Sequence, residues 1–337
     1  EAVEASEERP VLIDRFLENA VEIDVDVIAD RERAVIGAIM QHVEPAGIHS
    51  GDSASMIPAM GISMKMHKEI TRASKELARR LNVCGLMNIQ FAVKDEQLYV
   101  IEVNPRASRT VPFVSKAIGK PLAKMAAQIM AGKTLAELGF TQEITPEYHC
   151  VKEAVFPWGR FPGIDVVLGP EMKSTGEVMG IDPDPDIAFA KSQVSAFNPL
   201  PTEGKVFISV NDRDKERVLH MARQLADMGF TLCATRGTMI HLLQHDIECE
   251  RAYKVNEARR PNIVDHIKNG DIDFIINTPG SHDARADDII IRSSAIAAKT
   301  SYCTNLASAQ ACVNAIEALK NRNLQVCTIQ EYHAQTL

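Results

Sequence analysis

Hydrophobic and polar residues alternate along residues 86–103, a pattern typical of two short β-strands. We expect strands over 87–93 and 98–103, joined by a three-residue loop over 95–97. This loop length places Gln90 opposite Glu102. One face of the hairpin would then be apolar, with Ile89, Phe91, Val93, Tyr99, Ile101 and Val103. The other face would carry Gln90, Ala92, Glu102 and Asn104.

The polar face of this hairpin has two interpretations. Carboxylate and carboxamide oxygens are the ligands that Mg²⁺ and Mn²⁺ prefer. Arg106 and Arg109 follow at once, and guanidinium groups suit phosphate oxygens. These residues indicate a metal–nucleotide phosphate site. The alternative is a half-exposed hairpin with a polar outer face, and the hairpin alone leaves both open.

Further strands are predicted upstream, over 11–14, 21–28 and 34–41. The strand over 21–28 alternates strictly, with Glu22, Asp24 and Asp26 on one face. Acidic side chains in such a row usually form a solvated surface. The functional alternative is that one of them bonds a ligand hydroxyl or adds charge near the metal.

Residues 42–58 form a long loop by composition. Gly47 and Gly51 would let the backbone approach a ligand closely. His42 and His49 lack the spacing of a zinc site, so a metal role is not expected. His49 would suit a nucleotide edge or a ribose.

Amphipathic spacing predicts a helix over 66–81, with Ile70, Ala73, Leu77 and Leu81 inward, and a second helix over 122–130. A strand over 151–156 carries Glu153 among apolar neighbours, as an edge-strand acid or as a functional group. A helix follows over 187–197. The prolines and glycine of residues 198–204 predict a domain boundary, dividing the chain into 1–197 and 198–337.

Beyond that boundary, strands and helices alternate, which predicts a doubly wound α/β sheet with parallel strands. Strands are expected over 206–210, 230–234, 274–277 and 301–304, and helices over 214–228, 238–245, 263–268, 290–299 and 306–319. The fold class is therefore α/β, with an α+β first part.

Ligands of such sheets lie at the carboxyl ends of the strands. The segment Thr235-Arg236-Gly237-Thr238 comes there, directly before a helix, where backbone amides favour an anion. Lys215, Lys254 and Asn277 follow other strand ends. A phosphate pocket is the functional interpretation, and ordinary turn chemistry is the alternative. The sequence contains no GxGxxG and no GxxxxGK[ST], so neither a Rossmann site nor a P-loop is indicated.

Composition narrows the class of protein. The 337 residues suffice for about two domains. A net charge of −8 without a basic block argues against a nucleic-acid partner. No apolar run approaches the roughly 20 residues of a membrane span. The seven cysteines form no CxxC pair, which argues against a disulfide framework or a zinc site and fits a reducing cytoplasm.

The segment IQFAVKDEQLYVIEVNPRASRTVPF resembles the metal-binding core of ATP-grasp ligases. Together with RFLENAVEIDVDVI, HVEPAGIHSGDSA and SMIPAMGIS, it resembles the second synthetic half of the carbamoyl phosphate synthase large subunit. TRGT, KVNEARRPNIVDHIKNGDIDFIINTP and IRSSAI resemble the allosteric domain of that family, of methylglyoxal-synthase-like fold. The resemblance covers essentially the whole chain.

The resemblance implies an ATP-dependent ligase that phosphorylates carbamate with the second of two ATP molecules, in an enzyme that uses bicarbonate and glutamine-derived ammonia. Two Mg²⁺ or Mn²⁺ ions, with K⁺ as an optional further ion, would be bound by Gln90, Glu102 and Asn104, with Glu102 bridging. Arg106 and Arg109 would lie near the transferring phosphoryl group. The nucleotide would contact Arg15, Leu17, Glu22, Gly47, Ile48, His49, Ser50, Gln90 and Glu102.

The resemblance also implies regulation, a glutaminase small subunit as partner, an oligomeric full enzyme, and a role in arginine and pyrimidine biosynthesis. The activator ornithine would bind at Glu44, Asp52 and Glu153. UMP or IMP would bind at Lys215, Thr235, Thr238, Lys254 and Asn277.

The chain departs from the family pattern in two ways. The family's glycine-rich lid and first ATP-grasp lobe would lie before Glu1, so we expect a C-terminal portion that is inactive alone. After Asn277-Thr278 the chain reads Pro-Gly-Ser-His-Asp, where a further threonine and paired arginines are expected. The alternatives are a methylglyoxal-synthase-type phosphate lyase, with Asp283, Asp287 or Asp288 as base, and a purely regulatory nucleotide-binding fragment.

Overall fold

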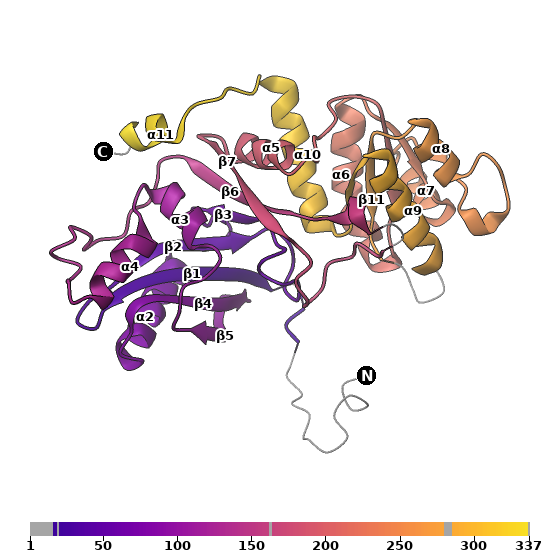
Figure 1. Ribbon diagram of the computed structural model, residues 1–337. Coiled ribbons are helices and arrows are strands. Elements are labelled where there is room, and N and C mark those ends of the chain that lie inside the picture. The colour runs from indigo at the N-terminus through magenta and orange to yellow at the C-terminus, as the bar shows by residue number, and fades with distance from the viewer. Residues whose placement is uncertain (1–15, 19, 162–163, 280–284, 336–337) are drawn as a thin grey trace, which may run out of the picture.

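A computed structural model describes residues 16–18, 20–161, 164–279 and 285–335. It contains two sheets of different kinds. A seven-stranded sheet with antiparallel pairing lies at the left of Figure 1, and a five-stranded parallel sheet lies at the right. The predicted α/β class is therefore confirmed. Of the predicted features, the strand over 11–14, Arg15 and Asp283 lie outside the described residues.

The antiparallel sheet has the strand order β5-β4-β1-β2-β3-β6-β7. Its strands are β1 Val21–Asp30, β2 Ala34–His42, β3 Ser55–Ile57, β4 Cys84–Lys94, β5 Gln97–Asn104, β6 His149–Val155 and β7 Gly176–Asp182. The five predicted strands within the described residues are confirmed with small shifts at their ends. The short β3 and β7 were not predicted.

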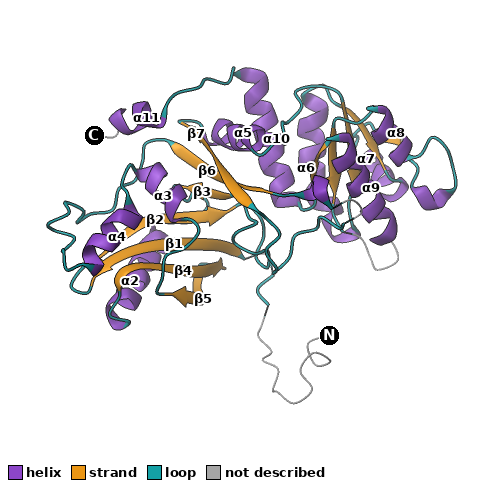
Figure 2. Ribbon diagram, viewed as in Figure 1, coloured by secondary structure: helices purple, strands orange, loops and turns teal. Residues whose placement is uncertain are grey.

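Helices cover both faces of this sheet (Figure 2). Val25 of β1 and Ile70 of α2 (Met64–Arg80) share one buried apolar cluster. On the other face, Ile28 and Leu86 pack with α3 (Val111–Ile118) and α4 (Leu122–Met130). Side chains at alternate positions share a face, so the even-numbered acids of β1 lie beside Ile28.

Two details of the helices differ from the sequence prediction. The helix α2 ends at Arg80, and Leu81, its C-cap residue, is 50% exposed. The chain then reverses at Asn82, whose φ is +51°, and Val83 returns to the core. The predicted inward position of Leu81 is therefore wrong. The helix α3, which begins at Val111 with Pro112 in its first turn, was not predicted.

The β4–β5 hairpin pairs Gln90 with Glu102 as predicted, but for a different reason. Its turn has two residues, Asp95 and Glu96, both with positive φ. With that turn alone, Gln90 would lie opposite Ile101. A bulge inserts one extra residue of β5 between the Phe91–Val100 and Gln90–Glu102 pairs, and this shift places Gln90 opposite Glu102. The predicted face assignment is consequently wrong at Tyr99 and Ile101. Leu98 packs on the core, whereas Tyr99 lies opposite Ala92 and Ile101 is 54% exposed.

The parallel sheet has the order β10-β9-β8-β11-β12. Its strands are β8 Lys205–Ser209, β9 Thr231–Ala234, β10 Glu250–Arg251, β11 Phe274–Asn277 and β12 Ser301–Cys303. Its helices are α6 Lys215–Asp227, α7 Arg236–Gln244, α8 Ile263–Asn269, α9 Arg285–Ala298 and α10 Leu306–Asn321. Helices α6 and α10 pack on one face, and α8 and α9 on the other. This is the predicted doubly wound arrangement.

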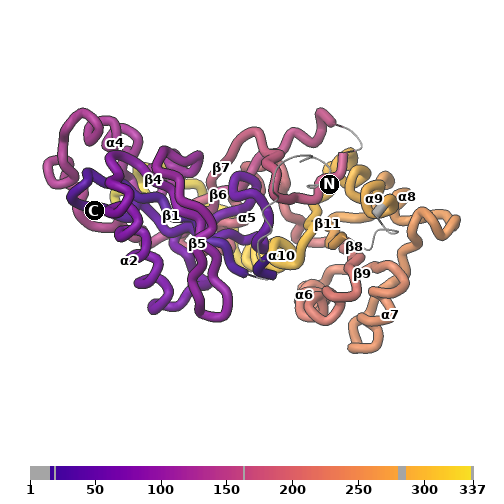
Figure 3. The backbone as a smooth tube through the Cα atoms, turned by 90° about the horizontal axis from the view of Figure 1, so that it is seen from below, coloured from indigo at the N-terminus to yellow at the C-terminus, as the bar shows by residue number. Residues whose placement is uncertain are grey.

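Two helices connect the sheets. Helix α5 (Pro185–Ser195) packs on β6 and β7 and also contacts α10. Helix α11 (Ile329–Gln335) returns to the antiparallel sheet (Figures 1 and 3). There the Tyr332 ring lies 5.2 Å from that of Tyr148. The predicted domain division at 197/198 stays a prediction.

The remaining helical segments are single 3₁₀ turns, η1 Trp158–Arg160, η2 Asp212–Asp214 and η3 Val255–Glu257. Within the described ranges, no helix is long and apolar enough to cross a membrane. All seven cysteines are free thiols, as the sequence predicted.

Gly180 of β7 provides a test of the α5 packing. A Cβ atom there would overlap the carbonyl oxygen of Ala188 and lie 2.6 Å from the backbone nitrogen of Ser192. We expect Gly180→Ala to lower the free energy of unfolding by about 1–3 kcal/mol or more, measured by urea denaturation. Gly176→Ala in the same strand is the control, because nothing lies within 4 Å of its Cβ. Equal stability of the two variants would contradict this packing.

Candidate functional site

A hollow of about 480 Å³ opens on the polar face of the antiparallel sheet. Seven residues predicted from the sequence line it: His49, Ser50, Gln90, Glu102, Asn104, Arg106 and Arg109. Asp24, one of the three acids predicted on a single strand face, and Gly51 of the predicted loop also line it. The lining residues Asn88, Ser108, Thr110, Lys152 and Glu177 were not predicted. The structure therefore brings most of the predicted metal and phosphate groups into one cavity.

The side-chain amides in this hollow present their oxygens. Gln90 donates from Nε2 to Ser50 Oγ at 2.8 Å, and Asn104 donates from Nδ2 to Glu102 Oε1 at 2.7 Å. Both carboxamide oxygens are therefore left available. In the described part of the chain, Oδ1 of the buried Asp24 accepts no hydrogen bond. Oxygens of this kind fit a hard divalent cation.

Asp26 connects β1 to the opposite wall of the hollow. Its Oδ1 accepts from Asn88 Nδ2 at 2.9 Å and from Ser108 Oγ at 2.8 Å, and its Oδ2 accepts from Thr110 Oγ1 at 2.7 Å. Burial raises the pKa of Asp26 to about 6, against the opposing effect of these donors. The carboxyl group fixes the 105–110 loop and thereby brings Arg106 to the hollow.

A histidine lies between Glu22 and Asp24, two further acids of β1. His42 Nδ1 is 3.2 Å from Glu22 Oε2, and its Nε2 is 3.2 Å from Asp24 Oδ2. Burial opposes the charged ring, but the two carboxylates outweigh it and raise the pKa of His42 to about 9. Asp24 and Asp26 are 2% and 1% exposed. The expectation of a solvated acidic face is therefore wrong, because each acid has a partner from another strand or loop.

The described residues before His49 that were predicted to contact the nucleotide lie outside the hollow. Glu22 Oε1 accepts from the backbone N–H of Gly47 at 3.2 Å, so its carboxylate holds the 42–58 loop. Gly47 has φ +101°, and an added Cβ would meet the Phe16 ring. Leu17, Glu22, Gly47 and Ile48 do not line the hollow.

The 49–51 loop is held over the hollow from β6. Lys152 is fully buried, and its Nζ donates to the Ser50 carbonyl at 3.0 Å. The Gly51 N–H donates to Nδ1 of His49 at 3.0 Å, which leaves Nε2 as a hydrogen-bond donor. A lysine beside Glu153, between the apolar residues Val151 and Ala154, was the signal that could have identified Lys152.

The predicted ornithine residues lie where the two sheets meet. Glu44 accepts from the Ala54 N–H at 2.7 Å and from Ser308 Oγ of α10 at 2.9 Å. Glu153 accepts from Gln193 Nε2 at 2.6 Å. Desolvation, and then the charge of Glu44, raise the pKa of Glu153 to about 8. Because β6 lies between β3 and β7, the interpretation of Glu153 as an edge-strand acid is wrong.

Asp52, the third of these residues, has a structural role. Its two oxygens accept the backbone N–H groups of Lys173 and Ser174 at 2.8 and 2.9 Å. The carboxylate therefore holds the backbone of residues 173–174.

A second hollow, of about 280 Å³, lies at the carboxyl ends of β8 and β9. Four predicted residues line it, Lys215, Thr235, Thr238 and Lys254, together with Ser209, Val210, Asp212, Arg236, Gly237 and Glu257. A Cβ on Gly237 would lie 3.3 Å from Lys215 Nζ, so glycine leaves room there. Thr235 makes no side-chain cap on α7, which leaves first-turn amides available to an anion.

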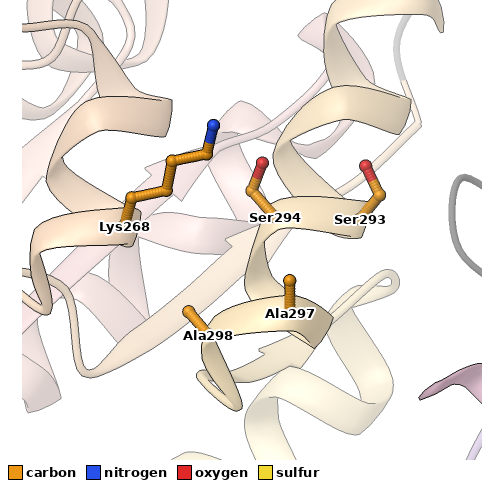
Figure 4. A pocket seen from close by; sticks show the side chains of 5 residues that line it. All are labelled: Lys268, Ser293, Ser294, Ala297 and Ala298. Atoms are coloured by element: carbon orange, nitrogen blue, oxygen red, sulfur yellow. The ribbon is translucent and has the colours of Figure 1, made fainter.

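Asn277, the fifth predicted residue, is not among those that line this hollow. It is 1% exposed and accepts from Arg292 Nη1 at 2.9 Å. Asp287 and Asp288, the candidate lyase bases, are also buried away from it. A third hollow, of about 370 Å³, is lined by Lys268 of α8 and small residues of α9, Ser293, Ser294, Ala297 and Ala298 (Figure 4).

Two families of known proteins match segments of this chain. Residues 1–138 match the family described as Carbamoyl-phosphate synthase L chain, ATP binding domain, and residues 217–304 match the MGS-like domain family. The chain thus combines an ATP-binding domain of the carbamoyl-phosphate synthase type with an MGS-like domain.

Over its whole length the chain is similar to carbamoyl phosphate synthase large chains. It is 51% identical over 337 residues to the Archaeoglobus fulgidus protein and 52% identical over 338 residues to the Pasteurella multocida protein. Each alignment covers 100% of this chain and 31% of the relative. The resemblance predicted from the sequence motifs is confirmed, and the chain spans about a third of these relatives.

Among solved structures, the biotin carboxylase domain of a single-chain bacterial carboxylase is similar at a TM-score of 0.45 and 18% identity. That match covers 55% of this chain and 48% of that chain.

His42 makes the stability of the site dependent on pH. Its pKa in the folded protein, about 9, exceeds the ordinary value of 6.5, so its contribution is complete below pH 6.5 and is lost as pH rises through 9. We expect His42→Gln to lower the free energy of unfolding by about 3–5 kcal/mol at pH 6, because it leaves buried acids unpaired. Urea denaturation at pH 6, 7.5 and 9 measures this.

The deficit of His42→Gln should shrink as pH rises towards 9. The control is His67→Gln, since His67 is a partly exposed histidine 3.8 Å from Glu143. A deficit of the same size at every pH would contradict the charged-histidine account.

Proposed function

We propose that the antiparallel-sheet part of this chain phosphorylates carbamate with ATP, forming carbamoyl phosphate. The main observation behind this proposal is that one hollow contains side-chain oxygens that suit a cation, from Asp24, Gln90, Glu102 and Asn104. Arg106 and Arg109 line the same hollow. The similarity to carbamoyl phosphate synthase large chains over the whole chain supports the same activity.

The residues of the hollow suit phosphoryl transfer. That reaction requires neutralised charge and fixed cations more than covalent chemistry from the protein. Gln90, Glu102 and Asn104 would hold two Mg²⁺ or Mn²⁺ ions, with Glu102 between them and K⁺ as an optional further ion. Bound divalent ions supply charge neutralisation on the phosphate oxygens. Arg106 and Arg109 would orient the transferring group, and His49 would donate to the nucleotide.

The wider assignment follows the relatives. This chain would act within a glutamine-hydrolysing carbamoyl phosphate synthase, with a glutaminase small subunit, in an oligomer of the full enzyme. The enzyme would act in the cytoplasm and would supply carbamoyl phosphate to arginine and pyrimidine biosynthesis. The division at 197/198 would separate the synthetic part from the allosteric part.

The second hollow supports an allosteric nucleotide site. Lys215, Lys254 and the amides before α7 would bind the phosphate of UMP or IMP. Glu44 and Glu153 would bind the amino groups of ornithine at the junction of the sheets, a position suited to communication between them because Glu44 contacts α10.

Glu102→Gln tests the catalytic assignment in the full-length large subunit with its partner. We expect carbamoyl phosphate formation from carbamate and ATP to fall at least about 100-fold, because the variant loses the charge that would hold the cations. The reverse reaction, ATP formation from ADP and carbamoyl phosphate, should fall equally. Asp95→Asn is the matched control, since it removes a carboxylate from the turn of the same hairpin. Full activity of Glu102→Gln in both directions would refute the assignment.

Lys254→Ala tests the allosteric assignment. UMP or IMP should raise the Tm of the wild-type chain, and the variant should bind the same nucleotide about tenfold or more weakly, because a charged donor to the phosphate is lost. Lys268→Ala is the control, because Lys268 lines the separate hollow beside α9. An unchanged nucleotide response in Lys254→Ala, or no response in the wild type, would count against this site.

A further inference from the structure

Three metal-ligating side chains meet outside both proposed nucleotide sites. Glu216 lies in the first turn of α6, His241 lies on α7, and His245 directly follows α7. One ligand atom from each lies within 4.8 Å of the other two. Among the described residues, no other group of three histidine, cysteine, aspartate or glutamate side chains brings its ligand atoms this close together.

We propose that Glu216, His241 and His245 bind a divalent cation of the class that prefers imidazole, such as Zn²⁺. The two histidines are four residues apart, one helical turn, so their rings are neighbours, with centroids 4.7 Å apart. Imidazole nitrogens favour zinc, cobalt and nickel over Mg²⁺, which takes oxygen ligands. Two histidines and one carboxylate leave an open position for water, as in known three-ligand zinc sites.

The hydrogen bonds of the histidines favour this use. His245 Nδ1 lies 2.9 Å from the His241 carbonyl oxygen, which only accepts, so the ring proton is on Nδ1 and the lone pair of Nε2 is free. Ligating histidines commonly donate their other N–H to a carbonyl in this way. Within the described structure, Nε2 of His241 is buried and makes no hydrogen bond.

The distance between His241 and Glu216 fits a shared cation as well as an ion pair. His241 Nε2 lies 3.3 Å from Glu216 Oε1, yet the two do not form a hydrogen bond. Two ligands that are about 2.0–2.1 Å from a tetrahedral zinc ion lie roughly 3.3–3.4 Å apart. The Glu216 side chain is 75% exposed, so it is free to rotate towards the rings. An ion pair would involve Glu216 and His241 alone, whereas a shared cation would also use the ligand nitrogen of His245, which lies within 4.8 Å of the other two ligand atoms.

Such a cation would join α6 to α7. Both helices begin at the second hollow, since Lys215 opens α6 and Thr235 precedes α7. The metal would therefore stabilise the walls of that hollow without contacting its lining residues.

Cobalt titration of the full chain tests the site, because Co²⁺ reports its ligands spectroscopically. We expect d–d absorption from one equivalent of Co²⁺ without a thiolate-to-cobalt charge-transfer band, which excludes the seven cysteines as ligands. Zn²⁺ should displace the cobalt and raise the Tm. His245→Ala and Glu216→Gln should each weaken Co²⁺ binding about tenfold or more. Because Glu216 is exposed, its variant should keep the fold, checked by an unchanged metal-free Tm.

His220→Ala is the matched control, because His220 lies on α6 one turn after Glu216 and outside the cluster. It should bind Co²⁺ with unchanged affinity. Unchanged binding in Glu216→Gln and His245→Ala would overturn the proposal. So would a thiolate charge-transfer band, or loss of binding in His220→Ala.

Discussion

The hydrogen bonds of Asp26 are the constraint on which the candidate ATP site depends. A buried carboxyl group is costly unless donors satisfy it. Here three donors do so, from β4 and from the loop that carries Arg106 and Arg109. Because these donors are 62 to 84 residues away in sequence, one side chain joins three parts of the chain. These bonds hold the loop itself to β1, and α3, which follows the loop, packs on Ile28 of the same strand.

The sheet face that carries Asp26 changes from apolar to polar along its length, and this change explains where the hollow opens. Towards Ile28 and Leu86 the face is apolar and covered by α3 and α4. Towards Asp24 and Gln90 it is polar and lines the hollow. The charged His42 lies between Glu22 and Asp24, and Lys152 holds the loop above them. Charges that would be unfavourable in a core are thus paired with one another, while the oxygens of Gln90, Glu102 and Asn104 remain for a ligand.

Local patterns predicted the elements well, because alternation and amphipathic spacing are local properties. The parallel sheet and four residues of the second hollow followed from strand-end positions. Gln90, Glu102, Asn104, Arg106 and Arg109 of the first hollow followed from the hairpin pattern and from residue type. Features set by distant contacts were missed. The bulge in β5 changed the faces of Tyr99 and Ile101, and it depends on a two-residue turn. The partners of Asp24 and Asp26 lie on other strands, so their burial was not visible from β1. Asn277 faces Arg292 because of how α9 packs on β11.

The central claim is that Gln90, Glu102 and Asn104 direct oxygens at a divalent cation. Anomalous diffraction from crystals grown with Mn²⁺ and a nucleotide tests it most directly. We expect a manganese peak with oxygens of Glu102 and of at least one of the two carboxamides within about 2.6 Å. Manganese bound elsewhere, with this hollow empty at saturating Mn²⁺ and nucleotide, would contradict the account.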